Sequence, residues 1–167
     1  GYMSKFIRTE NSINTDIGPN VVSAGYCMVD DDDYAIPLNN QHPYYKLILV
    51  PKGTLTLFDE NNKPYVLNEN DIALIKPNIK NSYTQAAVSE DYWANFVGAE
   101  ALLSMLKLDG ENIFIARLDK NTTGRLIPLF EDVINEAQLG KFAHEASTQL
   151  TLTKILLLIA RFVNGNF

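Results

Sequence analysis

The chain has 167 residues, 46% of them hydrophobic and 20% charged, a balance that predicts a single globular domain with a proper core. Its net charge of −6 and its scattered basic residues argue against a surface that grips nucleic acid by itself, because phosphate contacts require clustered lysine and arginine. No segment approaches the ~18 continuous apolar residues of a membrane span, and residues 1–10 lack the apolar run of a secretory signal.

The first half of the chain predicts short β-strands. They are expected at residues 21–29, 44–50, 54–59, 64–68, 72–76, 81–87 and 92–98, with turn-forming residues between them. Strands that recur about every ten residues predict an antiparallel sandwich or barrel. The only cysteine, Cys27, lies in the first strand and cannot form an internal disulfide, which favours a reducing, cytoplasmic location. Four consecutive aspartates at 30–33 lack the spacing of a Ca²⁺ loop and predict a solvated loop.

The second half of the chain predicts helices. A short helix is expected at 99–108, followed by one more strand at 113–118. A longer helix should follow the capping oxygens of residues 121–123 and end at Gly140, with Pro128 tolerated in its first turn. The last helix should run from about His144 to Val163 and end at Gly165.

This last helix carries more apolar residues than one buried face requires. We therefore expect a homodimer formed through it. The residues expected at that interface are Leu150, Ile155, Leu157, Leu158 and Phe162. The alternative is that the first long helix and the barrel together cover the whole apolar surface.

The strand at 92–98 holds the only tryptophan. Strand alternation places Trp93 and Asn95 on one side, where an aromatic plane lies beside an amide with two donors and an acceptor. This pair is a candidate wall of a pocket for a small polar molecule. The simpler interpretation is core packing, since aromatic residues in a barrel are most often core.

The candidates for catalysis are few. The two histidines, His42 and His144, are about a hundred residues apart in dissimilar contexts, so no metal site is expected. Cys27 sits in an apolar strand, where a buried thiol is inert by default. No phosphate-binding glycine loop is present, and neither a catalytic constellation nor a cofactor is expected. The sequence predicts a protein that is not an enzyme.

Several segments in combination resemble the N-terminal effector-binding and dimerisation domain of AraC-type transcription regulators. The segments are AGY at 24–26, YYKLILVPKG at 44–53, LNENDIALIKPNIKNSY at 67–83, YWANFVG at 92–98, FEDVINEAQ at 130–138 and the leucine-rich last helix. The likeness covers nearly the whole chain from residue 21 onward.

The resemblance implies a mainly β fold with C-terminal helices, in which a cupin-like jelly-roll barrel at 21–118 follows an N-terminal arm at 1–20. A helical pair for dimerisation occupies 119–167, within the same structural domain. A small effector, often a sugar, would bind inside the barrel, and the arm can fold over it. DNA would be bound by a C-terminal helix-turn-helix domain that these 167 residues do not include.

The resemblance also implies ligand-binding positions. Trp93 and Asn95 would offer an aromatic face and a planar amide to a pyranose ring, with Tyr83 on the neighbouring strand and Tyr45 and Tyr26 as further candidates. Asn95 and Asn81 stand where histidines are common, which argues further against a metal. An arginine often found shortly before the aromatic strand is not obvious in residues 38–42.

Two other functions fit parts of this pattern. A stand-alone cupin enzyme would share the barrel, but the missing histidines argue against it. A non-catalytic carbohydrate-binding jelly roll would share the pocket without needing the leucine-rich helices. No membrane partner is expected.

Overall fold

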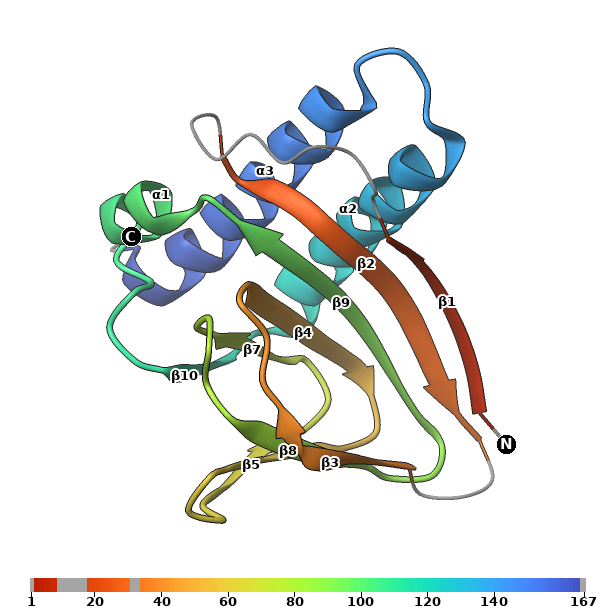
Figure 1. The fold of residues 1–167 in the computed structure, drawn as a ribbon, viewed down its shortest axis with the longest axis vertical. Helices are drawn as coiled ribbons and strands as arrows, with labels where there is room; N and C mark the ends of the chain where they lie inside the picture. Colours follow the sequence, from red (N-terminus) through yellow and green to blue (C-terminus); the bar gives the residue numbers. More distant parts are fainter. Residues whose placement is uncertain (1, 9–17, 31–33, 166–167) are drawn as a thin grey trace.

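The fold consists of two antiparallel β-sheets and three helices. A computed structural model of the chain describes residues 2–8, 18–30 and 34–165 (Figure 1). Across the six-stranded sheet the order is β1 (Tyr2–Arg8), β2 (Asn20–Val29), β9 (Ser89–Val97), β4 (Tyr45–Lys52), β7 (Asp71–Ile75) and β10 (Ile113–Arg117). Across the four-stranded sheet the order is β3 (Tyr34–Asn40), β8 (Asn81–Gln85), β5 (Leu55–Asp59) and β6 (Pro64–Leu67). The helices are α1 (Glu100–Met105), α2 (Lys120–Leu139) and α3 (His144–Asn164).

This arrangement confirms the predicted jelly-roll barrel with C-terminal helices. The eight predicted strands correspond to β2, β4 to β9 and β10, each within a few residues of its predicted bounds. Two strands were missed. β1 lies in the predicted arm and pairs with β2 along its whole length, and β3 lies in a stretch rich in asparagine and proline that does not alternate. Residues 9–17 of the predicted arm and 31–33 of the aspartate run lie outside the described residues.

The six-stranded sheet has two differently covered faces. Its outer face packs on the helices in a core that includes Leu47, Phe96 and Phe130. Its inner face closes against the four-stranded sheet around a second core that includes Ile48, Leu57 and Ile75. Because side chains alternate along a strand, β4, β7, β9 and β10 each contribute to both cores. β9 therefore separates the interior of the barrel from the helices.

Helix α2 begins earlier than predicted. Asp119 is its N-cap and accepts the backbone N–H of Thr122 at 2.7 Å. Pro128 consequently lies in the interior of the helix and not in its first turn. At an interior position the missing N–H of proline removes one hydrogen bond of the helix. The helix ends as predicted at Gly140, whose φ of 60° places it in the left-handed region.

Helix α3 is the most apolar helix. It is long and apolar enough, by length and composition, to cross a membrane. Its apolar side, however, is part of the domain core: Leu152, Ile155, Leu156 and Ile159 are all buried against the sheet and α2. The core helix of a globular domain can have the length and hydropathy of a membrane-spanning helix, and α3 is buried in the way that such a core helix is.

Burial corrects part of the predicted dimer surface. Ile155 and Leu158 are buried, with exposed fractions of 0% and 5%, and contribute to the core of their own chain. Leu150 is 73% exposed, and Leu157 and Phe162 are half-buried. The alternative interpretation, in which the barrel and α2 cover the helix, therefore holds for one of its two apolar faces.

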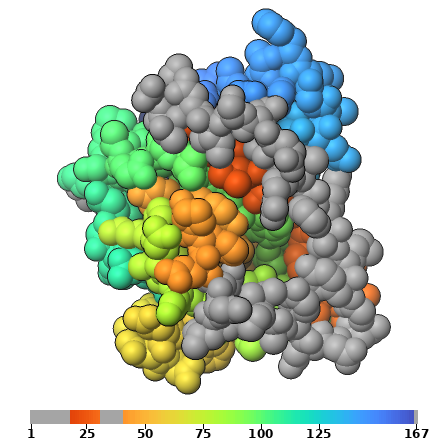
Figure 2. Space-filling view, viewed as in Figure 1, coloured from red at the N-terminus to blue at the C-terminus, as the bar shows by residue number. Residues whose placement is uncertain are grey.

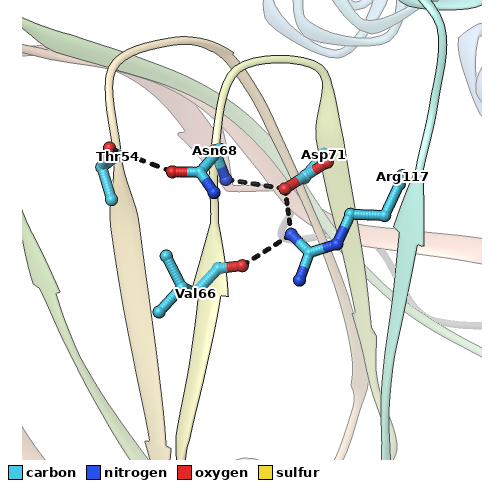
Figure 3. A network of polar contacts seen from close by, with 5 residues as sticks. All are labelled: Thr54, Val66, Asn68, Asp71 and Arg117. Carbon is cyan, nitrogen blue, oxygen red and sulfur yellow. Dashed lines mark hydrogen bonds and ion pairs between the residues drawn. The ribbon is translucent and has the colours of Figure 1, made fainter.

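A polar network holds β10 to the turn before β7 (Figure 3). Asp71, which is almost fully buried, accepts the backbone N–H of Asn68 at 2.7 Å and pairs with the guanidinium of Arg117. Arg117 also donates to the carbonyl of Val66 at 2.8 Å. A buried carboxylate needs such partners because an unpaired one is costly. The network ties the end of β10, three residues before α2 begins, to the turn between β6 and β7.

Candidate functional site

A row of polar side chains crosses three adjacent strands inside the barrel. Strand pairing places Asn95 of β9 between Ser23 of β2 and Lys46 of β4. Alternation turns all three toward the four-stranded sheet, because their neighbours along each strand belong to the helix-side core. A bulge at Val22 makes this possible: it shifts the register of β2, so that Val21 joins the outer core and Ser23 faces inward.

Two aromatic rings flank the ammonium of Lys46. Its Nζ lies 5.5 Å from the ring centroid of Trp93 and 5.7 Å from that of Tyr83. Both distances are within the range of cation–π attraction. Trp93 comes from β9 and Tyr83 from β8, so the lysine lies between the two sheets. All three side chains are only half-buried although they point into the barrel.

Figure 2 shows the surface hollowed over β9. The green surface of β9 forms the floor of the hollow, between the red of β2 and the orange of the residues around β4. Half-buried side chains on the inner face of a closed sheet agree with an internal space open to solvent. The half-buried side chains of Lys46, Trp93 and Tyr83 therefore border a solvent-accessible part of the barrel, and Ser23 and Asn95, each 5% exposed, lie deeper.

The amide of Asn95 has an unused hydrogen-bonding atom. Its Nδ2 donates to the hydroxyl of Ser23 at 2.9 Å, and the residue is 95% buried. Its Oδ1 accepts no hydrogen bond from the residues that the structure describes. Buried amide oxygens are seldom left in this state, since the lost hydrogen bond to water costs free energy. A bound molecule with a hydroxyl or N–H group would satisfy it.

Burial perturbs the two charged groups of this interior. Desolvation raises the pKa of Asp91, on β9, to about 7, and the hydrogen-bonding side chain of Gln85, the charge of Lys46 and Cys27 act against this shift. Desolvation also lowers the pKa of Lys46, while the charge of Asp91 opposes that effect. The structure shows no ion pair between Lys46 and the carboxylates of its described residues. A buried ammonium without a paired carboxylate favours the binding of an anionic group beside it.

The five predicted ligand residues separate into two groups. Trp93, Asn95 and Tyr83 all lie on the inner side of the barrel, around Lys46, and their role in ligand binding stays a prediction. Tyr45 and Tyr26 do not join them. Tyr45 is 6% exposed and stacks on Phe96 in the helix-side core, at a centroid distance of 5.4 Å.

Tyr26 lines a different space, between the outer face of the sheet and α2. A cavity of about 170 Å³ there is bounded by Tyr26, Tyr92, Glu131, Ile134 and Asn135. Tyr92 donates to Glu131 at 2.9 Å, and Tyr26 donates to Glu90. Burial, with these carboxylates, raises the pKa of both phenols, so both stay protonated donors.

The sequence interpretation missed Lys46. The sequence does contain a sign of it: Lys46 is a single lysine inside the apolar run YYKLILV, and it alternates onto the same face as the inward-facing Ile48 and Val50. A lysine placed there is either a snorkelling surface residue or a functional group. His42 lines a small space of about 10 Å³ together with Lys46 and Asn81, whereas His144 lies at the start of α3, next to the carbonyl of Lys141. The structure places no group of three histidine, cysteine, aspartate or glutamate side chains together among its described residues.

Comparison with known proteins identifies related sequences and folds. The family model described as the AraC-like ligand binding domain matches residues 28–156. No curated protein matches the sequence. An apo structure of ToxT from Vibrio cholerae is 11% identical, with a TM-score of 0.53, and the match covers 92% of this chain and 53% of that chain. The present chain thus spans about half the length of that protein.

Two further solved structures match with lower TM-scores. ToxT from Vibrio cholerae bound to (E)-4-(8-methylnaphthalen-1-yl)but-3-enoic acid is 15% identical with a TM-score of 0.48, covering 99% of this chain and 59% of that chain. A cupin superfamily protein from Desulfitobacterium hafniense is 9% identical with a TM-score of 0.42, covering 57% of this chain and 78% of that chain. At these identities the likeness concerns the fold.

Proposed function

The chain belongs to the family of AraC-like ligand-binding domains, and from this membership we propose that it is the effector-sensing and dimerising part of a DNA-binding transcription regulator. The effector would be a small sugar-like molecule held inside the barrel. DNA would be contacted by helix-turn-helix units outside these 167 residues, in a cytoplasmic protein. The domain would act without catalysis.

One observation carries the sugar-like assignment. Inside the barrel, the ring of Trp93 lies next to the amide of Asn95, whose Oδ1 has no partner among the described residues. A pyranose ring has an apolar C–H face that packs on an aromatic plane, and hydroxyl groups that donate to amide oxygens. Tyr83, across the barrel from β9, would close the other side of the ring.

The proposal predicts stabilisation of this chain by a sugar. A thermal-shift screen with mono- and disaccharides should reveal at least one that raises the melting temperature. A ligand present at a hundred times its dissociation constant adds roughly 2.7 kcal/mol to the free energy of unfolding, because it binds only the folded state.

The control is Trp93→Ala, which should melt cooperatively but lose most of the ligand-induced shift. Tyr45→Phe is a matched variant on the opposite face of the sheet and should keep the shift. If no sugar stabilises a cooperatively melting protein, the sugar-like effector is wrong. If a sugar stabilises Trp93→Ala as well as the parent, the effector binds elsewhere.

The dimer is the second part of the proposal. It is supported by the exposed face of α3, where Leu150 is 73% exposed and Leu157, two turns further on, is half-buried. Two copies of this face would bury apolar surface that the domain itself leaves uncovered. We place the dimer contact at Leu150 and Leu157, whereas Phe162, about 140° around the helix from Leu157, packs against the core of its own chain.

We expect the chain to be dimeric in size-exclusion chromatography with light scattering, and Leu150→Glu to be monomeric. The introduced carboxylates would face each other across the two-fold axis, where like charges repel. Val88→Glu, an equally drastic change at an exposed residue between β8 and β9, should remain dimeric. A monomeric parent chain would contradict the dimer and favour a stand-alone carbohydrate-binding module.

A further inference from the structure

The lysine inside the barrel narrows the chemistry of the effector. This inference rests on the proposed function, because it concerns the same site. Lys46 brings a positively charged group into the polar row, although burial lowers its pKa, and a neutral sugar has no group that would compensate this charge. Either the charge is incidental to binding, or the ligand carries the matching negative charge.

The geometry favours the second possibility. Lys46 Nζ lies 5.5 Å from the ring centroid of Trp93 and 5.7 Å from that of Tyr83, so an anion bound to the ammonium would lie beside both rings. Among the described residues it has no carboxylate partner at ion-pair distance. Asp91, the carboxylate that acts on it electrostatically, is itself buried and is only partly ionised at neutral pH, because burial raises its pKa to about 7.

A second observation specifies hydroxyl groups as well. Asn95 pairs with Lys46 across the strands, so its free Oδ1 lies on the same face as the ammonium. A ligand that places an anion on Lys46 would therefore need a donor group next to that anion. The hydroxyl of Ser23, bonded to Asn95 Nδ2, extends this row of polar groups to β2. A simple apolar acid would leave the amide oxygen unpaired.

We propose that the effector is a sugar acid, a hydroxylated ring that carries a carboxylate. The carboxylate binds the ammonium of Lys46 in a charge-assisted hydrogen bond. A ring hydroxyl donates to Asn95 Oδ1, and the apolar face of the ring packs on Trp93, with Tyr83 opposite.

The test compares acids with their neutral parents. Thermal shift and isothermal titration calorimetry are performed with D-glucuronate and D-galacturonate, with D-glucose and D-galactose, and with cyclohexanecarboxylate, an acid without hydroxyls. We expect at least one uronate to bind at least tenfold more tightly than its neutral parent and than cyclohexanecarboxylate. The comparison of each uronate with its neutral sugar uses the unmutated protein. It therefore tests the requirement for a carboxylate even if a substitution impairs folding.

Variants then assign the charge to its residue. Lys46→Met should reduce the affinity for the uronate at least tenfold and abolish its preference over the neutral sugar, whereas Lys46→Arg should keep part of the preference. Lys141→Met, a matched change at an exposed lysine between α2 and α3, should bind like the parent. Equal uronate affinity in Lys46→Met would overturn the role of Lys46.

The outcomes separate this inference from the proposed function. If a neutral sugar binds as well as its acid and depends on Trp93, the sugar acid is wrong and the effector-sensing function stands. If cyclohexanecarboxylate binds as well as the uronates, the charge matters but the hydroxyl recognition is wrong. If none of these molecules binds, both the sugar acid and the sugar-like effector are wrong.

Discussion

Asp91→Asn is expected to abolish a fall in stability that the parent protein undergoes as the pH rises from about 4 to about 7. Burial raises the pKa of Asp91 in the folded protein from 3.8 to about 7. Over this interval the unfolded chain loses its proton first, so the unfolded state gains relative to the folded one. The stability due to the neutral acid is complete below about pH 4 and is lost by about pH 7.

The expected size is large for one residue. The difference between 3.8 and about 7 corresponds to roughly 4 kcal/mol in the free energy of unfolding. The groups facing Asp91 are Lys46 on β4, Cys27 on β2 and Gln85 on β8, and the ammonium of Lys46 reduces the loss by stabilising the carboxylate. Urea denaturation near pH 4.5 and near pH 8 would measure the change for the parent and for the amide variant.

The quantity to compare is the difference between the two proteins at each pH, because other carboxylates also titrate. Asp119, for example, has a lowered pKa as the N-cap of α2 and contributes the opposite slope. Asp132→Asn, a change at an exposed carboxylate of α2, is the matched control and should retain the slope of the parent. Identical slopes in Asp91→Asn and the parent would show that Asp91 is ionised in the folded state throughout.

Phe130→Ala is expected to lower the free energy of unfolding by about 3–5 kcal/mol, enough to unfold a marginally stable domain. Phe130 is fully buried where α2 meets the sheet, and its ring lies 6.1 Å from that of Tyr92 on β9. Removal of the ring leaves a cavity between α2 and the sheet that rigid strands cannot fill. Chemical denaturation at neutral pH would measure the loss.

The chain offers a size-matched control in Phe142, which lies between α2 and α3 and is fully exposed. Phe142→Ala removes the same atoms from solvent and should change stability by less than about 0.5 kcal/mol. A loss in Phe130→Ala no larger than that of Phe142→Ala would mean that the helices do not depend on this contact.

The strand pattern and turn residues were enough to predict most of the fold. The regular alternation of β9 located Trp93 and Asn95 on one face, and Gly140 and Gly165 marked the ends of the two long helices. The start of α2 was misplaced because Asp119 caps it before the threonines that look like caps. β3 was missed because Pro37 and its polar neighbours lower the strand signal.

The candidate site could be predicted only in part. Tyr26 and Tyr45 look equivalent to Tyr83 in sequence, but strand alternation turns them toward the helices. Alternation shows only which residues share a face, and the sequence does not show which face is the inside of the barrel. Ser23 reaches the interior through a bulge that leaves no signal in the sequence. Lys46 was overlooked because a lysine in a strand is usually at the surface.

The position of β9 between the two cores has a mechanical consequence. Asp91, Trp93 and Asn95 border the inside of the barrel, while the intervening Tyr92 bonds to Glu131 of α2 and touches Phe130. Only the thickness of one strand then separates a molecule held in the barrel from the helices that would join two subunits. Coupling between ligand binding and the position of the helices would therefore need no chain of intervening side chains. A small rotation of β9 would move the side chains on both of its faces together.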